Sequence, residues 1–134
     1  GSEMCIRDSI YELSSVARQL TADQTLVARE IAAGRLTPEQ AERDSRRSVL
    51  LQCVGASPVV EPDFIAGDVM SGATYMLCSD GFRHKISNEE MMSKIGPAAC
   101  GTETEMENGC KFLTELVKQR RETDNITVVL IKTE

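Results

Sequence analysis

The chain has 134 residues, 41% hydrophobic and 27% charged, which fits one globular domain or a piece of one and excludes a disordered polymer. Fifteen Lys and Arg against 21 Asp and Glu give a net charge of −6, which disfavours nucleic acid or an anionic membrane as a partner and favours a divalent metal. The five cysteines form no Cys-x-x-Cys pair and no apolar run could span a membrane, so a cytoplasmic protein is expected.

The first third of the chain predicts a strand followed by a helical hairpin. Residues 1–9 open with Gly-Ser and are expected to be a tag or non-native leader. Residues 10–13 predict a strand without a recognisable hairpin partner, which suggests that part of the domain precedes it. Apolar residues at helical spacing over 23–33 predict a helix that Gly34 ends, and the capping box at residues 37–40 opens a second helix.

The middle of the chain predicts strands of different quality. Residues 49–55 are apolar and are expected to be a strand or a buried connector. Residues 59–66 are interrupted by Pro62, so they are expected to be an edge strand or irregular. Residues 74–78 form a compact apolar run between turn signals, which predicts a buried strand that stops at Ser79-Asp80-Gly81.

The C-terminal part predicts two helices and a final strand. A second capping box at residues 87–90 opens a helix that runs to Ile95 and ends at Gly96-Pro97. A longer helix is expected over 105–121, with its apolar residues at helical spacing. The β-branched run 125–131 predicts a central strand.

Two acidic residues stand at strand boundaries and form the candidate metal site. Asp80 follows one predicted strand directly and Asp124 precedes another, so antiparallel pairing of these strands would bring both carboxylates to one sheet edge. Two close carboxylates repel unless a cation lies between them, and hard oxygen ligands favour Mg²⁺ or Mn²⁺. Each acidic residue alone is more typical of an ordinary turn than of a metal site, because Asp and Asn side chains bond their own backbone.

The segments around these aspartates are similar to two C-terminal motifs of the 2C-type serine/threonine protein phosphatases. The similarity extends in order to three segments nearer the N-terminus, so it covers nearly everything from Ile10 onward. It implies an α+β fold, part of an α-β-β-α sandwich of mostly antiparallel strands, in which two bridged Mg²⁺ or Mn²⁺ ions activate the water that attacks phosphoserine or phosphothreonine in a protein substrate. The matching segments are residues 76–82, 124–129, 20–27, 34–41 and 48–55.

The resemblance assigns Asp80 and Asp124 as metal ligands and names no further catalytic residue. Asp8 stands where family members have a ligand of a third metal, but the arginine of their Gly-Asp-Ser-Arg motif is replaced here by Ile10. The family's Asp-Gly-x-x-Gly motif, which supplies the ligand that bridges both metals, and its phosphate-binding arginine are absent from these 134 residues. Two hypotheses therefore stand: the C-terminal part of a phosphatase domain, inactive alone, or a phosphatase-like binding or regulatory module.

The hairpin, three arginines, the single histidine and the cysteines each have a functional and a simpler interpretation. By resemblance the hairpin at about 21–47 is the flap beside the phosphatase active site. Arg43, Arg46 and Arg47 could contact a phosphopeptide, but a charged run is more often a solvated face. His84, the sole histidine, is expected in a surface turn, and the cysteines are expected to be small buried residues. An incomplete sandwich would also expose sheet edges, through which the chain could self-associate.

Overall fold

The computed structural model describes residues 8–134 except 24, 48, 52–54, 56–57 and 60. The described residues fall into two compact units, which we treat separately. The sheet unit comprises residues 8–21 and 65–134, and the helical unit comprises the described residues of 22–64. Helices in the described part of the chain are too short or too polar to cross a membrane.

A four-stranded antiparallel sheet forms the centre of the sheet unit, in the order β2-β1-β3-β4. The α+β class and the antiparallel sheet are thus confirmed. The first strand begins at Asp8, inside the segment expected to be a leader, and it has the hairpin partner that the sequence did not reveal. That partner is only three residues long and lacks an apolar alternation, so its pattern gave no signal. The strands are β1 Asp8–Leu13, β2 Ala17–Gln19, β3 Thr74–Ser79 and β4 Val128–Lys132.

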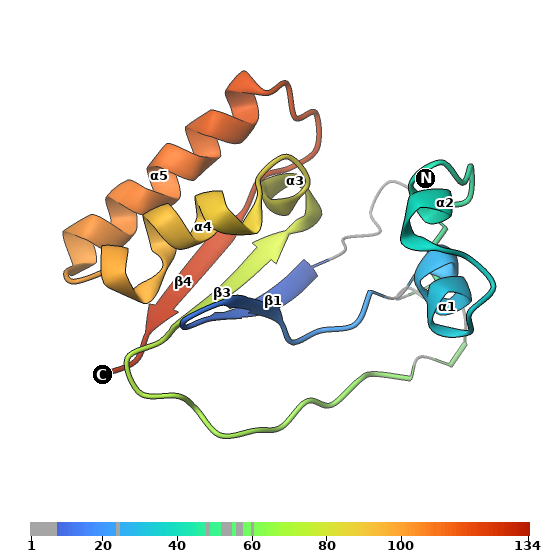
Figure 1. Cartoon of the computed structure of the whole chain (residues 1–134), viewed down its shortest axis with the longest axis horizontal. Coiled ribbons are helices and arrows are strands. Elements are labelled where there is room, and N and C mark those ends of the chain that lie inside the picture. The colour runs from blue at the N-terminus through green and yellow to red at the C-terminus, as the bar shows by residue number, and fades with distance from the viewer. Residues whose placement is uncertain (1–7, 24, 48, 52–54, 56–57, 60) are drawn as a thin grey trace. The chain divides into compact units, whose positions relative to one another are not determined.

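Helices cover one face of this sheet (Figure 1). They are α3 Asp80–Arg83, α4 Asn88–Ile95, the short 3₁₀ helix η2 Pro97–Ala99 and α5 Glu103–Gln119. The predicted helices are confirmed with small shifts at their ends. One continuous core joins the covered sheet face to the helices, and its fully buried side chains include Leu13, Met76, Phe82, Met91, Ile95, Leu113 and Val117.

The opposite face of the sheet is apolar and exposed. Leu77 pairs with Val129 in the register of β3 and β4, and the two residues are 39% and 52% exposed. Ile131, two residues along β4, is 51% exposed. The prediction of a central C-terminal strand is therefore wrong, since β4 ends the described sheet. A β-branched run indicates a strand with apolar faces, but it does not show which faces the chain covers.

Two polar contacts fix the ends of the helices in the sheet unit. Ser87 caps α4 through the predicted capping box, in which its hydroxyl accepts from the Glu90 N–H and the Glu90 carboxylate accepts from the Ser87 N–H. The same carboxylate receives both arms of the Arg120 guanidinium at 2.8 and 2.7 Å, directly after α5. One glutamate thus joins the start of α4 to the end of α5.

The helical unit contains the predicted hairpin. Helix α1 Leu26–Ala32 starts at the cap Thr25 and ends before Gly34, whose φ of 75° suits glycine. Helix α2 Pro38–Glu42 opens with the Thr37 capping box, as predicted.

The two apolar segments that follow α2 form no regular strand in the described part. Leu50 makes a single bridge to Thr25, while residues 52–54 lie outside the described residues. The described residues of 59–66 are irregular, which was one of the two alternatives.

Candidate functional site

Asp80 and Asp124 lie on backbone segments that hydrogen bonds hold together at one end of the sheet. Asp80 is the first residue of α3, directly after β3, and Asp124 lies in the loop between α5 and β4. Between them, the Ser79 N–H donates to the Thr127 carbonyl at 2.9 Å. The Ser79 hydroxyl donates to the Asn125 carbonyl at 2.9 Å and accepts from the Thr127 N–H at 3.0 Å. The serine thus fixes the Asp124 loop to the end of β3.

Gly81 brings the two segments into direct backbone contact. A Cβ atom at this position would lie 2.2 Å from the Asn125 carbonyl oxygen and 3.3 Å from the Asp124 carbonyl carbon. These distances leave no room for a side chain. The Ser-Asp-Gly sequence is therefore more than a turn signal, because its glycine permits the contact between the two aspartate-bearing segments.

Asp8 is placed at the same end of the sheet by the register of β1, where it pairs with Ser79. Asp8 and Asp124 are exposed and Asp80 is half-buried. These carboxylates are the ligand type that Mg²⁺ and Mn²⁺ prefer. Within the described ranges, however, no three His, Cys, Asp or Glu side chains come together in an arrangement that could hold a metal ion. The carboxylate oxygens of these aspartates therefore fit a hard divalent ion. The structure brings their backbone segments together, but it does not gather their side chains into a complete set of metal ligands.

The loop that carries Asp124 starts from a sharp helix stop. Arg121 has a φ of 61°, in the left-handed region that usually holds glycine. Its N–H donates to the Lys118 carbonyl and the following Glu122 N–H donates to the Val117 carbonyl, the pair of bonds that defines a Schellman motif. This turn reverses the chain after α5 and leads it toward Asp124.

Glu122 then holds the loop from within. One of its carboxylate oxygens, Oε1, accepts from the backbone N–H groups of Thr123 and Asp124, both at 3.1 Å. The other oxygen, Oε2, is buried, and among the described residues it has no hydrogen bond of good geometry. Burial acts to raise the pKa of Glu122. The Asp124 and Thr123 N–H groups and nearby His84 lower it by more, so that the pKa of Glu122 lies below its ordinary value.

His84 lies beside that buried oxygen, with its Nδ1 atom 3.3 Å from Glu122 Oε2. Its side chain is 70% exposed, so the expectation of a surface position is confirmed. It also follows α3 directly, where its N–H donates to the Asp80 carbonyl at 2.9 Å. Sequence reasoning missed Glu122 altogether. The available signal was a glutamate two residues before Asp124, just after a helix end.

The remaining candidates that the structure describes are not arranged for catalysis. Cys78 and Cys100 are free and buried, as expected, and burial raises the pKa of the Cys78 thiol to about 11, far from a reactive thiolate. Cys5 and Cys53 lie outside the described residues. In the helical unit, Arg46 pairs with Asp44 at 2.9 Å within one turn, while Arg43 and Arg47 are exposed.

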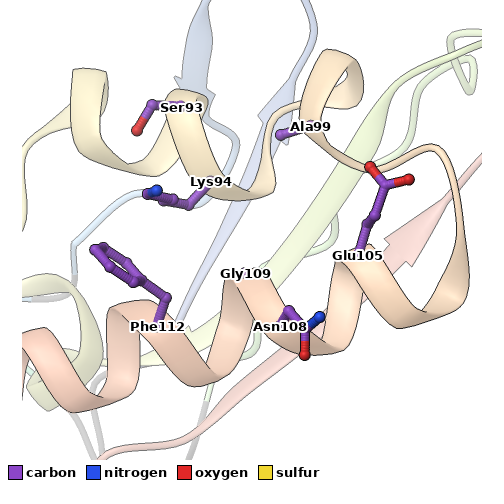
Figure 2. A pocket seen from close by; sticks show the side chains of 7 residues that line it. All are labelled: Ser93, Lys94, Ala99, Glu105, Asn108, Gly109 and Phe112. Atoms are coloured by element: carbon purple, nitrogen blue, oxygen red, sulfur yellow. The ribbon is translucent and has the colours of Figure 1, made fainter.

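A shallow hollow of about 300 Å³ lies between α4 and α5. Figure 2 shows the Lys94 side chain beside the Phe112 ring, and the ammonium nitrogen lies 4.2 Å from the ring centroid. None of the candidate metal ligands lines it. Its lining residues are Ser93, Lys94, Ala99, Glu105, Asn108, Gly109 and Phe112.

Comparison with known proteins identifies relatives of one kind, although no family model matches the chain. Protein phosphatase PhpP of Streptococcus pneumoniae is 34% identical over 116 residues, which are 84% of this chain and 44% of PhpP. A putative 2C-type protein phosphatase of Streptococcus pyogenes is 31% identical over 115 residues, 86% of this chain and 45% of that protein.

Solved structures that resemble this chain are phosphatases as well. The serine/threonine phosphatase of S. agalactiae superposes with a TM-score of 0.82 at 28% identity, over 96% of this chain and 52% of that one. The catalytic domain of the phosphatase PstP, solved with two manganese ions, gives a TM-score of 0.72 at 27% identity, over 95% of this chain and 50% of that one. The chain thus spans about half the length of the curated relatives it matches. By sequence and by fold it is a homologue of the 2C-type serine/threonine protein phosphatases.

Proposed function

We propose that this chain supplies the C-terminal part of a metal-dependent phosphatase domain that hydrolyses phosphoserine and phosphothreonine in proteins. The observation that carries the proposal is the backbone contact of Gly81 with the segment of Asp124 and Asn125, which brings two carboxylate-bearing segments to one end of the sheet. The homology to serine/threonine phosphatases supports the same reaction.

In this proposal Asp80 and Asp124 are the metal ligands, and Asp8 at the same sheet end is a third candidate. The metal is Mn²⁺ or Mg²⁺, in keeping with the manganese ions of the PstP structure. When bound, such ions lower the pKa of a water molecule and neutralise charge on the phosphoryl group. The part played by this chain is to hold two carboxylates near each other, through Ser79 and Gly81.

The helical unit has a separate role in the proposal. The hairpin at about 21–47 acts as the flap that shapes substrate access, and its arginines are available to a phosphorylated peptide because Arg43 and Arg47 are exposed. The cytoplasm is the compartment we propose, since Cys78, Cys100 and Cys110 are free thiols.

The alternative function is a phosphatase-like module that binds partners without catalysis. It applies if no other part of the protein supplies an Asp-Gly-x-x-Gly segment, whose ligand could bridge two metals, since these 134 residues contain none. The two functions differ in what happens when such a ligand is supplied.

The test joins the chain to the N-terminal half of a 2C-type relative and measures hydrolysis of phosphoserine and phosphothreonine peptides with Mn²⁺. We expect metal-dependent turnover that Asp80→Asn or Asp124→Asn abolishes. Asp68→Asn is the matched control, because Asp68 is exposed in an irregular segment. A well-folded fusion that binds Mn²⁺ but has no turnover would favour the binding module, and turnover that survives both aspartate substitutions would refute the assigned ligands.

A further inference from the structure

Glu122 lies at the junction between two segments that carry the candidate metal ligands. Its side chain is only 5% exposed although it belongs to a surface loop. The Arg121 turn directs it inward, and its Oε1 atom accepts the N–H groups of Thr123 and Asp124. A buried carboxylate that accepts two backbone N–H groups fixes the backbone on the N-terminal side of Asp124.

The C-terminal side of Asp124 is fixed by a different residue. There Ser79 bonds the Asn125 carbonyl and the Thr127 N–H. Asp124 itself is exposed, and its Oδ1 atom accepts a local bond from the Asn125 N–H at 2.8 Å. The position of Asp124 therefore depends on the two anchors that flank it.

His84 connects the first of these anchors to the segment of Asp80. It stands at the C-terminal end of α3, the one-turn helix that begins with Asp80, and its N–H bonds the Asp80 carbonyl. Its Nδ1 atom reaches to 3.3 Å from the buried Glu122 Oε2 atom. The contact spans the two segments at a point that neither Ser79 nor Gly81 touches.

We propose that Glu122 is a positioning residue for Asp124 and that His84 tethers it to the Asp80 segment, so that the two candidate ligands keep one arrangement. The inference rests on the proposed metal role of the two aspartates. Residues that orient metal ligands in this way affect metal affinity by roughly 10–100-fold when removed.

The test uses the 134-residue chain with two readouts. NMR hydrogen exchange at the Thr123 and Asp124 amides reports the anchor without any metal, and calorimetric titration with Mn²⁺ reports the ligand site. Glu122→Ala should speed exchange at both amides roughly tenfold, the loss expected for hydrogen bonds to a charged acceptor, and should weaken Mn²⁺ binding about tenfold or more. Glu122→Gln keeps an oxygen acceptor and should restore most of the protection.

His84→Ala tests the tether. We expect a smaller effect than that of Glu122→Ala, and no further effect of His84→Ala when Glu122 is already alanine. Glu115→Ala is the matched control, since Glu115 is an exposed glutamate of α5 that forms an ion pair with Lys118. It should change neither readout.

The outcomes separate this inference from the proposed function. Unchanged exchange at both amides in Glu122→Ala would overturn the positioning role whatever the metal does. Faster exchange with unchanged Mn²⁺ affinity, in a chain whose Asp124→Asn variant binds Mn²⁺ more weakly, would also overturn it. If Asp124→Asn itself leaves Mn²⁺ affinity unchanged, the ligand assignment fails first, and the positioning role toward a metal falls with it.

Discussion

A Cβ atom on Gly81 would lie 2.2 Å from the carbonyl oxygen of Asn125, far inside van der Waals contact. Because the obstacle is backbone on a segment fixed by Ser79, neither side can yield without moving β3 or the Asp124 loop. We expect Gly81→Ala to cost about 1–3 kcal/mol in the free energy of unfolding. Urea denaturation measures this.

The control for Gly81→Ala is Gly67→Ala. Gly67 has an ordinary φ and no atom within 4 Å of a built Cβ, so its substitution should be neutral or slightly stabilising. Equal stability of the two variants would show that the close approach at Gly81 relaxes without cost.

The helix stop at Arg121 predicts a stabilising substitution. A left-handed φ of 61° disfavours a residue with a Cβ by about 1–2 kcal/mol. Glycine relieves this strain, but the greater entropy that it gives the unfolded chain destabilises the fold by about 0.4–1 kcal/mol. Arg121→Gly should therefore raise the free energy of unfolding by about 0.5–1 kcal/mol. Gly34→Ala, at the matching position after α1, should lower it, since Gly34 has a φ of 75°. A destabilising Arg121→Gly would indicate that the arginine side chain makes a contribution of its own.

The two capping boxes predict equal costs at distant places. Thr37→Ala and Ser87→Ala each remove the acceptor for the N–H of the third helical residue, at α2 and α4, and should cost about 1 kcal/mol. Thermal melts of the two variants test this, with Thr37→Ser and Ser87→Thr as controls that keep the hydroxyl. Midpoints that equal the parent's in both alanine variants would contradict the prediction.

These features show which parts of the fold are readable from the sequence. Both capping boxes were predicted because each is formed by two residues only three positions apart in the sequence. The edge position of β4 was not, since a pattern of β-branched residues does not reveal whether Val129 and Ile131 are covered. The approach of Glu122 to His84 was hidden too, because it depends on a left-handed turn at an arginine, where sequence rules expect glycine.

The pairing of Glu90 with Arg120 predicts an acid-sensitive contribution to stability. Arg120, together with the Ser87 N–H, lowers the pKa of Glu90 from 4.5 to about 2. Because the folded-state pKa lies below the unfolded one, the stabilisation is complete above about pH 4.5 and is lost as the pH falls toward 2. The gap in thermal midpoint between the parent and Glu90→Gln should therefore shrink between pH 6 and pH 3. A gap that is constant over this range would show that the ionised form of Glu90 is not what stabilises the contact.

The last prediction concerns the 134-residue chain alone, which we expect to be nearly inactive on phosphoserine and phosphothreonine peptides even with millimolar Mn²⁺. Two carboxylates hold a hydrated ion weakly, whereas a two-metal site needs a bridging ligand to keep the ions roughly 3.5–4 Å apart. The exposed apolar face at Leu77, Val129 and Ile131 and the open edge at β4 should also make the chain self-associate.

Adding the N-terminal half of a relative, in trans or in one chain, should raise turnover and solubility together. The added strands would cover the exposed face and edge, and the added ligand would bridge the two metal ions. Light scattering and peptide dephosphorylation measured on the same samples provide the test. A charged substitution on the open face, Val129→Lys, should reduce self-association of the chain alone without creating turnover. Robust Mn²⁺-dependent turnover by the unaided chain, retained in both Asp80→Asn and Asp124→Asn, would contradict the mechanism, because catalysis would then come from groups other than these carboxylates.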